Sequence, residues 1–259
     1  MQPFNEEMTI TVCPGRTKSG KPEMFDPIDI SPGDTISIVG PTGSGKTAFI
    51  NDIEVFAQGD TVTGRRVLVN GQAPPENYIR DPACKPIAMI TQNTKCLADL
   101  TVHEFLSMHV TTRNNLQSDI IEETIALANN FTGEKITDGA RMSSLSGGQT
   151  RSLMIADAVL ISKAPILLLD EIENAGIFKE AVISHLKGLR KAVIFVTHDP
   201  YVSMLSDRRI VMKGGEVVSI LHPGDSEMEA LDKIKRIDEA LSALRERIRV
   251  GEVIGSGSF

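Results

Sequence analysis

Several residue types are scarce in this chain. It has no tryptophan and two tyrosines, and aromatic residues make up 4% of its 259 positions. Basic residues are outnumbered, with 27 Lys and Arg against 34 Asp and Glu, which gives a formal net charge of −7. Proteins dedicated to nucleic acid normally carry a basic surface. The charge balance therefore argues against nucleic-acid binding as the main function, although it does not exclude a local basic groove.

Cysteines and long apolar runs are scarce too. Cys13, Cys84 and Cys96 lack the paired spacing of zinc sites or disulfide frameworks, and such a sparse set is typical of a reducing compartment. The longest apolar run, 164–169, is far shorter than the roughly 20 residues that a membrane-spanning helix needs. The first residues form no secretory signal. We expect a cytoplasmic protein without a membrane span, either free or bound peripherally at the inner face of the cell membrane.

The hydrophobic pattern predicts an α/β fold. With 41% hydrophobic residues, a chain of this length can bury a sizeable core. Apolar, β-branched segments alternate with helical ones, which indicates a parallel sheet covered on both faces. Gly214-Gly215 marks a hairpin between the last two strands. The predicted strands are 8–12, 35–39, 66–70, 87–91, 166–169, 192–197, 209–212 and 216–220.

Two segments are predicted to be mainly helical. Residues 97–145 read as a small helical subdomain, in which Thr101 and Glu104 form a capping box. Residues 225–249 form a charged helix whose apolar residues follow a spacing of three and four. This stripe packs on its own domain or makes a short coiled-coil contact. We therefore divide the chain into a domain at 1–224 and a tail at 225–259, which is this helix and a flexible end.

A glycine-rich loop follows the predicted strand 35–39 and precedes a helix. It reads Gly40, Pro41, Thr42, Gly43, Ser44, Gly45, Lys46, Thr47, which is a complete phosphate-binding loop. Its glycines allow backbone N–H groups to point at phosphate oxygens, and the helix adds the positive end of its dipole. Lys46 is expected to reach the β- and γ-phosphates of a nucleoside triphosphate, and Thr47 to ligate Mg²⁺.

Polar residues at three other strand ends complete a hydrolytic site. Asp170 and Glu171 end an apolar strand; Asp170 is expected to hold Mg²⁺ and Glu171 to polarise the attacking water. His198 follows the strand 192–197 and is placed to bond the γ-phosphate and this carboxylate. Gln92 follows the strand 87–91 and is expected to touch both Mg²⁺ and the water.

A second anion-binding turn lies about a hundred residues after the first. Residues 145–149 read Leu-Ser-Gly-Gly-Gln, in which Ser146, Gly147, Gly148 and Gln149 open a helix. A helix N-terminus attracts negative charge. Two phosphate sites this far apart suggest one nucleotide gripped from two sides.

In order and spacing, these motifs resemble those of the ATP-binding cassette (ABC) ATPases, over about residues 8–222. The resemblance implies a RecA-like P-loop core sheet with an antiparallel β subdomain and a small helical subdomain. It implies ATP and Mg²⁺ as ligands and a head-to-tail dimer with a second ABC subunit, which a second copy of this chain could supply. Ser146, Gly148 and Gln149 of one subunit would then grip the phosphate held by Lys46 of the other.

The sequence departs from the family pattern in two places. Residues 13–18 carry no aromatic residue to stack on adenine, so Arg16 is a candidate for that contact. After Glu171, the segment 172–177 lacks the usual aspartate, whose position falls at Ile177, and Asn174 is a candidate substitute.

Three functions stay open. The family favours the ATPase subunit of a membrane transporter whose transmembrane permease subunits are separate chains. The altered segment 172–177 and the charged tail favour a soluble ATPase that drives assembly, remodelling or enzyme activation. Nucleic-acid maintenance is disfavoured, because no long coiled coil fits between the two phosphate motifs. A P-loop kinase or GTPase does not explain residues 145–149.

Overall fold

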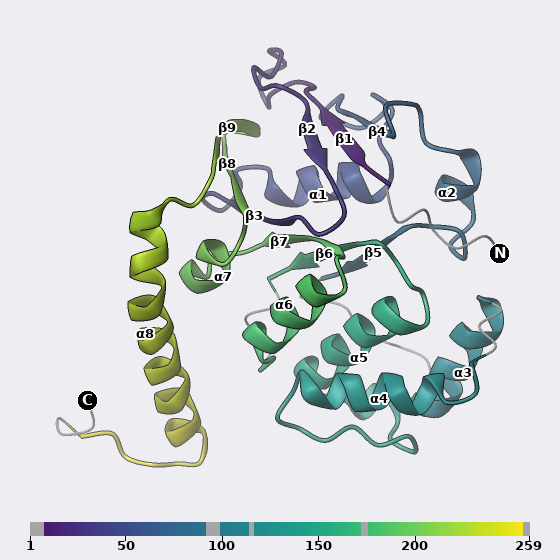
Figure 1. Cartoon of the computed structure of the whole chain (residues 1–259), viewed down its shortest axis with the longest axis vertical. Coiled ribbons are helices and arrows are strands. Elements are labelled where there is room, and N and C mark those ends of the chain that lie inside the picture. Colours follow the sequence, from purple (N-terminus) through teal and green to yellow (C-terminus); the bar gives the residue numbers. More distant parts are fainter. Residues whose placement is uncertain (1–7, 92–98, 114–116, 172–175, 256–259) are drawn as a thin grey trace.

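A six-stranded sheet forms the centre of the molecule (Figure 1). The computed structural model describes residues 8–91, 99–113, 117–171 and 176–255. The strand order is β5-β6-β7-β3-β8-β9; the first five run parallel and β9 is antiparallel to β8. The bounds are β5 Ile87–Ile90, β6 Ile166–Asp170, β7 Ala192–Val196, β3 Thr35–Val39, β8 Arg208–Lys213 and β9 Glu216–Leu221.

A second, antiparallel sheet has the order β2-β1-β4. Its strands are β2 Ile28–Ile30, β1 Ile10–Cys13 and β4 Arg66–Val69. The parallel core with an antiparallel subsheet confirms the predicted α/β class. The predicted strands are confirmed with bounds that differ by at most two residues, and β3 has the predicted bounds. Strand β2 was not predicted, because three residues are too few to show periodicity.

The helices cover both faces of the central sheet. They are α1 Lys46–Glu54, α2 Glu76–Arg80, α3 Val102–Thr112, α4 Ile120–Asn130, α5 Gly147–Leu160, α6 Lys179–Gly188, α7 Pro200–Met204 and α8 Asp225–Arg249. The predicted capping box of Thr101 and Glu104 is present at the start of α3. Within the described part of the chain, no helix combines the length and the apolar character needed to cross a membrane.

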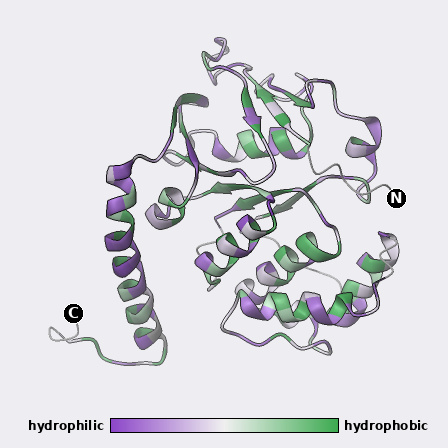
Figure 2. Ribbon diagram, viewed as in Figure 1, coloured by the Kyte–Doolittle hydropathy of each residue, from purple (hydrophilic) through white to green (hydrophobic). Residues whose placement is uncertain are grey.

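Strand β6 shows why the core strands are apolar without alternation. Leu167 and Leu169 face a core that includes residues of α3 to α6, whereas Ile166 and Leu168 face a second core with α1 and the small sheet. Both faces are therefore buried, as in parallel sheets generally. Figure 2 agrees with this burial: the central strands are largely hydrophobic, whereas the outlying helix α8 is largely hydrophilic.

Helix α8 runs along the outer side of α7 and extends beyond it (Figure 1). Its predicted apolar stripe is only partly covered, because Ile234 and Leu244 are half-buried and the other three residues are exposed. Ile237, Leu241 and Ile248 are 57%, 47% and 57% exposed. The prediction that the stripe packs on the domain is therefore wrong for these three residues.

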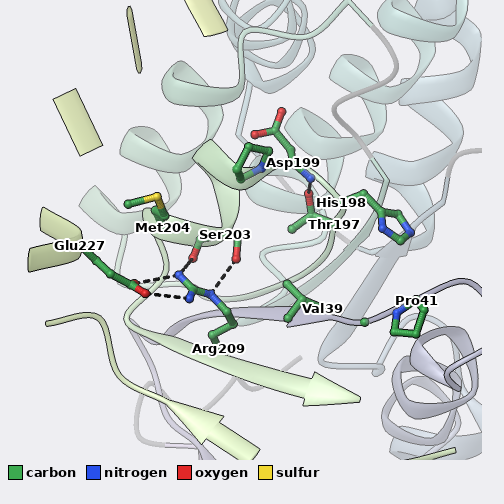
Figure 3. A pocket seen from close by; sticks show the side chains of 11 residues that line it. Val39, Pro41, Thr197, His198, Asp199, Ser203, Met204, Arg209 and Glu227 are labelled. Carbon is green, nitrogen blue, oxygen red and sulfur yellow. Dashed lines mark hydrogen bonds and ion pairs between the residues drawn. The ribbon is translucent and has the colours of Figure 1, made fainter. Parts of the chain in front are cut away.

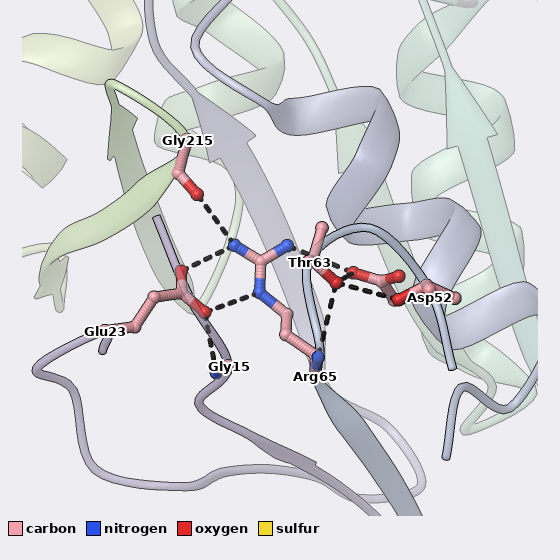
Figure 4. Close-up of polar contacts among 7 residues, drawn as sticks. Gly15, Glu23, Asp52, Thr63, Arg65 and Gly215 are labelled. Atoms are coloured by element: carbon pink, nitrogen blue, oxygen red, sulfur yellow. Dashed lines mark hydrogen bonds and ion pairs between the residues drawn. The ribbon is translucent and has the colours of Figure 1, made fainter. Parts of the chain in front are cut away.

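A buried ionic cluster joins four segments of the chain (Figure 4). Arg65 donates two hydrogen bonds to Glu23, at 2.8 and 2.6 Å, and one to Asp52 of α1 at 3.1 Å. It also donates to the carbonyl oxygen of Gly215, between β8 and β9, at 3.0 Å. The carboxylate of Glu23 accepts the N–H of Gly15 as well. Because Arg65 and Glu23 side chains are fully buried, each charge depends on its partners.

We predict that Arg65→Met lowers the free energy of unfolding by about 3–5 kcal/mol, because it leaves Glu23 and Asp52 buried without their cation. Urea denaturation measures this loss as a lower midpoint with an unchanged slope. Arg66→Met is the control, since Arg66 is exposed. Equal midpoints for the two variants would contradict a stabilising role for the cluster.

Candidate functional site

The loop 40–47 connects the end of β3 to α1, as predicted. Gly43 and Gly45 have φ angles of 76° and 102°, in the region that favours glycine. At Gly40, a Cβ atom would lie 2.2 Å from the carbonyl oxygen of Met212 on β8. The sequence therefore needs glycine here both for backbone conformation and for close packing on the neighbouring strand.

The side chains of this loop are arranged for an anion. The Nζ of Lys46 donates to the carbonyl oxygens of Gly40 and Pro41, at 2.8 and 3.3 Å, so the ammonium group is curled over the loop. The Ser44 hydroxyl is buried and has no hydrogen-bond partner among the described residues. An unpartnered buried hydroxyl and a folded-back ammonium group in one loop fit a phosphate ligand.

The predicted acids lie at the carboxyl end of β6, next to β7. Asp170 pairs with Val196 at the end of β7, and Glu171 donates its backbone N–H to the carbonyl of Val196. Glu171 has a φ of 49°, an unusual conformation for a residue other than glycine that costs about 1–3 kcal/mol. Its Oε1 lies 3.6 Å from Nε2 of His198. The structure thus brings together the proposed base and the proposed histidine.

The loop that precedes residue 23 lies against the phosphate loop through a contact that the sequence did not reveal. Lys18 Nζ donates to the carbonyl oxygen of Gly43 at 2.5 Å. The two residues are 25 positions apart, so no local pattern signals the contact. The Arg16 side chain is exposed, and its backbone N–H donates to Thr63 at 2.7 Å. Stacking of Arg16 on a base stays a prediction.

The motif 145–149 forms the N-terminus of α5. The Ser146 hydroxyl accepts the N–H of Gln149 at 3.2 Å, and the Gln149 side chain accepts the N–H of Ser146 at 2.8 Å, which is a capping box. The Gln149 amide also donates to the Lys135 carbonyl at 3.1 Å. These hydrogen bonds hold the turn in place without any contact to the loop 40–47 of the same chain.

Some predicted residues lie outside the described part of the chain. Gln92 is one of them, and so is Asn174. Ile177, at the position of the missing aspartate, is 6% exposed and belongs to the core beside α6. Its side chain is therefore packed inward, which explains why an apolar residue is tolerated there.

A cavity of about 580 Å³, open to solvent, lies between the phosphate loop and α7 (Figure 3). Gly40, Pro41 and His198 line one side. Arg209 and Glu227 line the other, joined by two hydrogen bonds of 3.1 and 3.0 Å. The hydrogen bonds from Arg209 lower the pKa of the Glu227 carboxyl below its ordinary value. The start of α8 is thereby fixed at the edge of this cavity.

Comparison with known proteins agrees with this geometry. A family model described as ABC transporter matches residues 27–174. An uncharacterized ABC transporter ATP-binding protein of Methanocaldococcus jannaschii is 47% identical over 243 residues, which is 94% of this chain and 93% of that protein. The chain spans 55% and 40% of the length of two further curated relatives.

Two solved structures show the same fold. The cbiO1 protein of Clostridium perfringens, part of an ABC transporter complex, is 21% identical with a TM-score of 0.65, over 94% of this chain and 99% of that chain. A dimeric ATP-binding cassette bound to ADP and phosphate is 24% identical with a TM-score of 0.62, over 83% of this chain and 99% of that chain. With the family match and the 47% identical relative, the chain belongs to the ABC transporter family, as an ATP-binding cassette that hydrolyses ATP.

Proposed function

We propose that this chain powers a membrane transporter whose permease subunits are separate chains, by closing as a head-to-tail dimer around two ATP molecules. The observation that carries the proposal is the meeting of a complete phosphate loop with the Glu171–His198 pair at one sheet edge. The relative that is 47% identical over 94% of the chain is named as an ABC transporter ATP-binding protein, which supports the transport role. Such a subunit works at the cytoplasmic face of a membrane.

The phosphate loop, Glu171 and His198 each have a defined part in hydrolysis. Lys46 and the backbone N–H groups of the loop bind the β- and γ-phosphates. Glu171 accepts a proton from water as the water oxygen bonds to the γ-phosphorus. The bond between that phosphorus and the β–γ bridging oxygen breaks, which releases ADP and phosphate. His198, 3.6 Å from Glu171, holds the γ-phosphate and the carboxylate in line.

The residues present also fit Mg²⁺. Thr47, exposed in the first turn of α1, and Asp170, partly exposed at the end of β6, offer only oxygen atoms, which are the ligands that Mg²⁺ prefers. Gln92 is a third candidate ligand outside the described residues. The bound ion would neutralise charge on the phosphates.

The second phosphate contact comes from the partner subunit. Ser146, Gly148 and Gln149 at the start of α5 of one subunit face the γ-phosphate held by Lys46 of the other. Two helix N-termini aimed at one triphosphate neutralise charge that a single one would leave. Each site is therefore completed in trans.

We predict that Glu171→Gln lowers the rate of hydrolysis at least about 100-fold, because the base is lost while the ATP-binding residues stay. With ATP and Mg²⁺ the variant should then accumulate as a dimer in size-exclusion chromatography with light scattering. The control is Glu171→Gln combined with Lys46→Ala, which should stay monomeric. A monomeric Glu171→Gln protein at saturating ATP would contradict closure by this chain alone.

We predict that Ser146→Ala and Thr101→Ala each lower the free energy of unfolding by about 1 kcal/mol, because each removes one helix cap. The two residues occupy equivalent capping boxes, on α5 and α3. Only Ser146→Ala should also lower the hydrolysis rate, by about 100-fold, since it removes a donor to the γ-phosphate. If both variants lost activity equally, Ser146 would have only a structural role.

We predict that tagged Glu171→Gln protein, pulled down from its native cells with ATP, recovers a multi-span membrane protein that mass spectrometry identifies. Because this variant does not hydrolyse its ATP, the dimer should stay closed and remain bound to the permease during the pull-down. Ser146→Ala combined with Glu171→Gln is the control, since it should not close. Recovery of soluble proteins alone would contradict the transport role and favour an assembly or remodelling ATPase.

A further inference from the structure

Lys179, the first residue of α6, carries an interaction that the hydrolytic residues do not explain. Its side chain is 12% exposed, although a cation in the first turn of a helix is disfavoured by the helix dipole. Two carboxylates offset this cost. Asp199 Oδ2 lies 2.6 Å from the Lys179 Nζ, and Asp238 Oδ2 of α8 lies 2.9 Å from it.

Burial by itself would lower the pKa of Lys179. The hydrogen bonds to Asp199 and Asp238 outweigh burial, so the net effect is a raised pKa. A raised pKa stabilises the folded state at every pH below the ordinary pKa of lysine. This contribution is lost only as the pH rises through the raised pKa of the folded protein. The Lys179 ammonium group is therefore charged under physiological conditions.

Asp199 is the residue after His198 and fixes the chain around it. Its Oδ1 accepts the backbone N–H groups of Tyr201 and Val202, at 2.8 and 3.1 Å, which caps α7. Its own N–H donates to the Thr197 hydroxyl at 2.9 Å. With Oδ1 engaged by α7 and Oδ2 by Lys179, the Asp199 carboxylate has one orientation, and the backbone of His198 is held on both sides.

We propose that Lys179 is a positioning residue for His198, acting through Asp199, and that Asp238 makes this positioning depend on where α8 lies. The position of the C-terminal helix would thus affect the hydrolytic site through the Lys179 ammonium group. A partner that shifts α8 would withdraw Asp238 and loosen the hold on His198. This inference rests on the role proposed above for His198.

A second ion pair between α6 and α8 supplies a matched control. Lys235 of α8 donates to Glu180 of α6 at 2.7 Å, one residue after Lys179. This pair joins the same two helices but does not include Asp199. Lys179→Met and Lys235→Met therefore remove one cation each from the same interface, and only the first removes a cation that holds Asp199.

The test compares four full-length variants in ATP hydrolysis and in amide hydrogen exchange: Lys179→Met, Lys179→Arg, Asp238→Asn and Lys235→Met. Lys179→Met should lower kcat on the order of 10–100-fold with little change in KM, because a displaced group slows the chemical step. Lys179→Arg should restore much of the rate, and Asp238→Asn should lie between Lys179→Met and wild type. Lys235→Met should hydrolyse ATP as the wild type does.

Hydrogen exchange reads the position of the segment independently of activity. The amides of Tyr201 and Val202 should exchange faster in Lys179→Met and Asp238→Asn than in Lys235→Met. Equal exchange at these amides, or equal kcat in Lys179→Met and Lys235→Met, would overturn the proposal. If His198→Ala hydrolysed ATP at the wild-type rate, the role of His198 would fail instead, and the exchange comparison would still decide whether Lys179 ties α8 to residues 197–202.

Discussion

The site depends on one constraint, the parallel direction of β3, β6 and β7. Parallel strands end at the same edge of a sheet, so the segments that follow them meet there. The phosphate loop follows β3, Glu171 follows β6, and His198 follows the residue after β7. Because β7 lies between β3 and β6, the histidine stands between the loop and the carboxylate. The direction of the strands alone therefore brings three motifs that are far apart in sequence into one site.

Two groups of charges, one fully buried around Arg65 and one partly buried around Lys179, hold the surroundings of this edge in place. On one side, Arg65 ties the N-terminal loop and the β8–β9 turn to α1, which carries Lys46. On the other side, Lys179 ties α7 and α8 to α6. Removing one member of such a group leaves its partners without a counter-charge, so each group stabilises the contact between the segments that it joins.

Much of the fold and site could be predicted from the sequence, because the information was local. The strand, loop and helix around 40–47 lie together in the chain, and a capping box is visible within four residues. The apolar run at β6 reflects burial on both faces, which a single strand can show. The site prediction for Glu171 and His198 rested on motif order, and the structure places them 3.6 Å apart.

Other features could not be predicted, because they depend on residues that only the fold brings together. Lys18 meets Gly43, and Lys179 meets Asp238, across 25 and 59 positions. A charged residue in a sequence gives no sign of its partner at such a distance. The stripe on α8 shows the opposite error: its spacing is that of a packed helix, yet Ile237 and Ile248 are each 57% exposed. Periodicity identifies an apolar face and does not say what covers it.

We propose that each ATP site is built from two chains, and a mixture of two impaired variants can show whether the sites are shared. Lys46→Ala lacks the phosphate lysine, and Ser146→Ala lacks the contact from the partner. In a mixed dimer, one site carries both lesions and the other carries neither. With shared sites, ATP hydrolysis that is strongly reduced in each variant alone should return on mixing. Hydrolysis that stays at the level of the single variants at every mixing ratio would rule out shared sites.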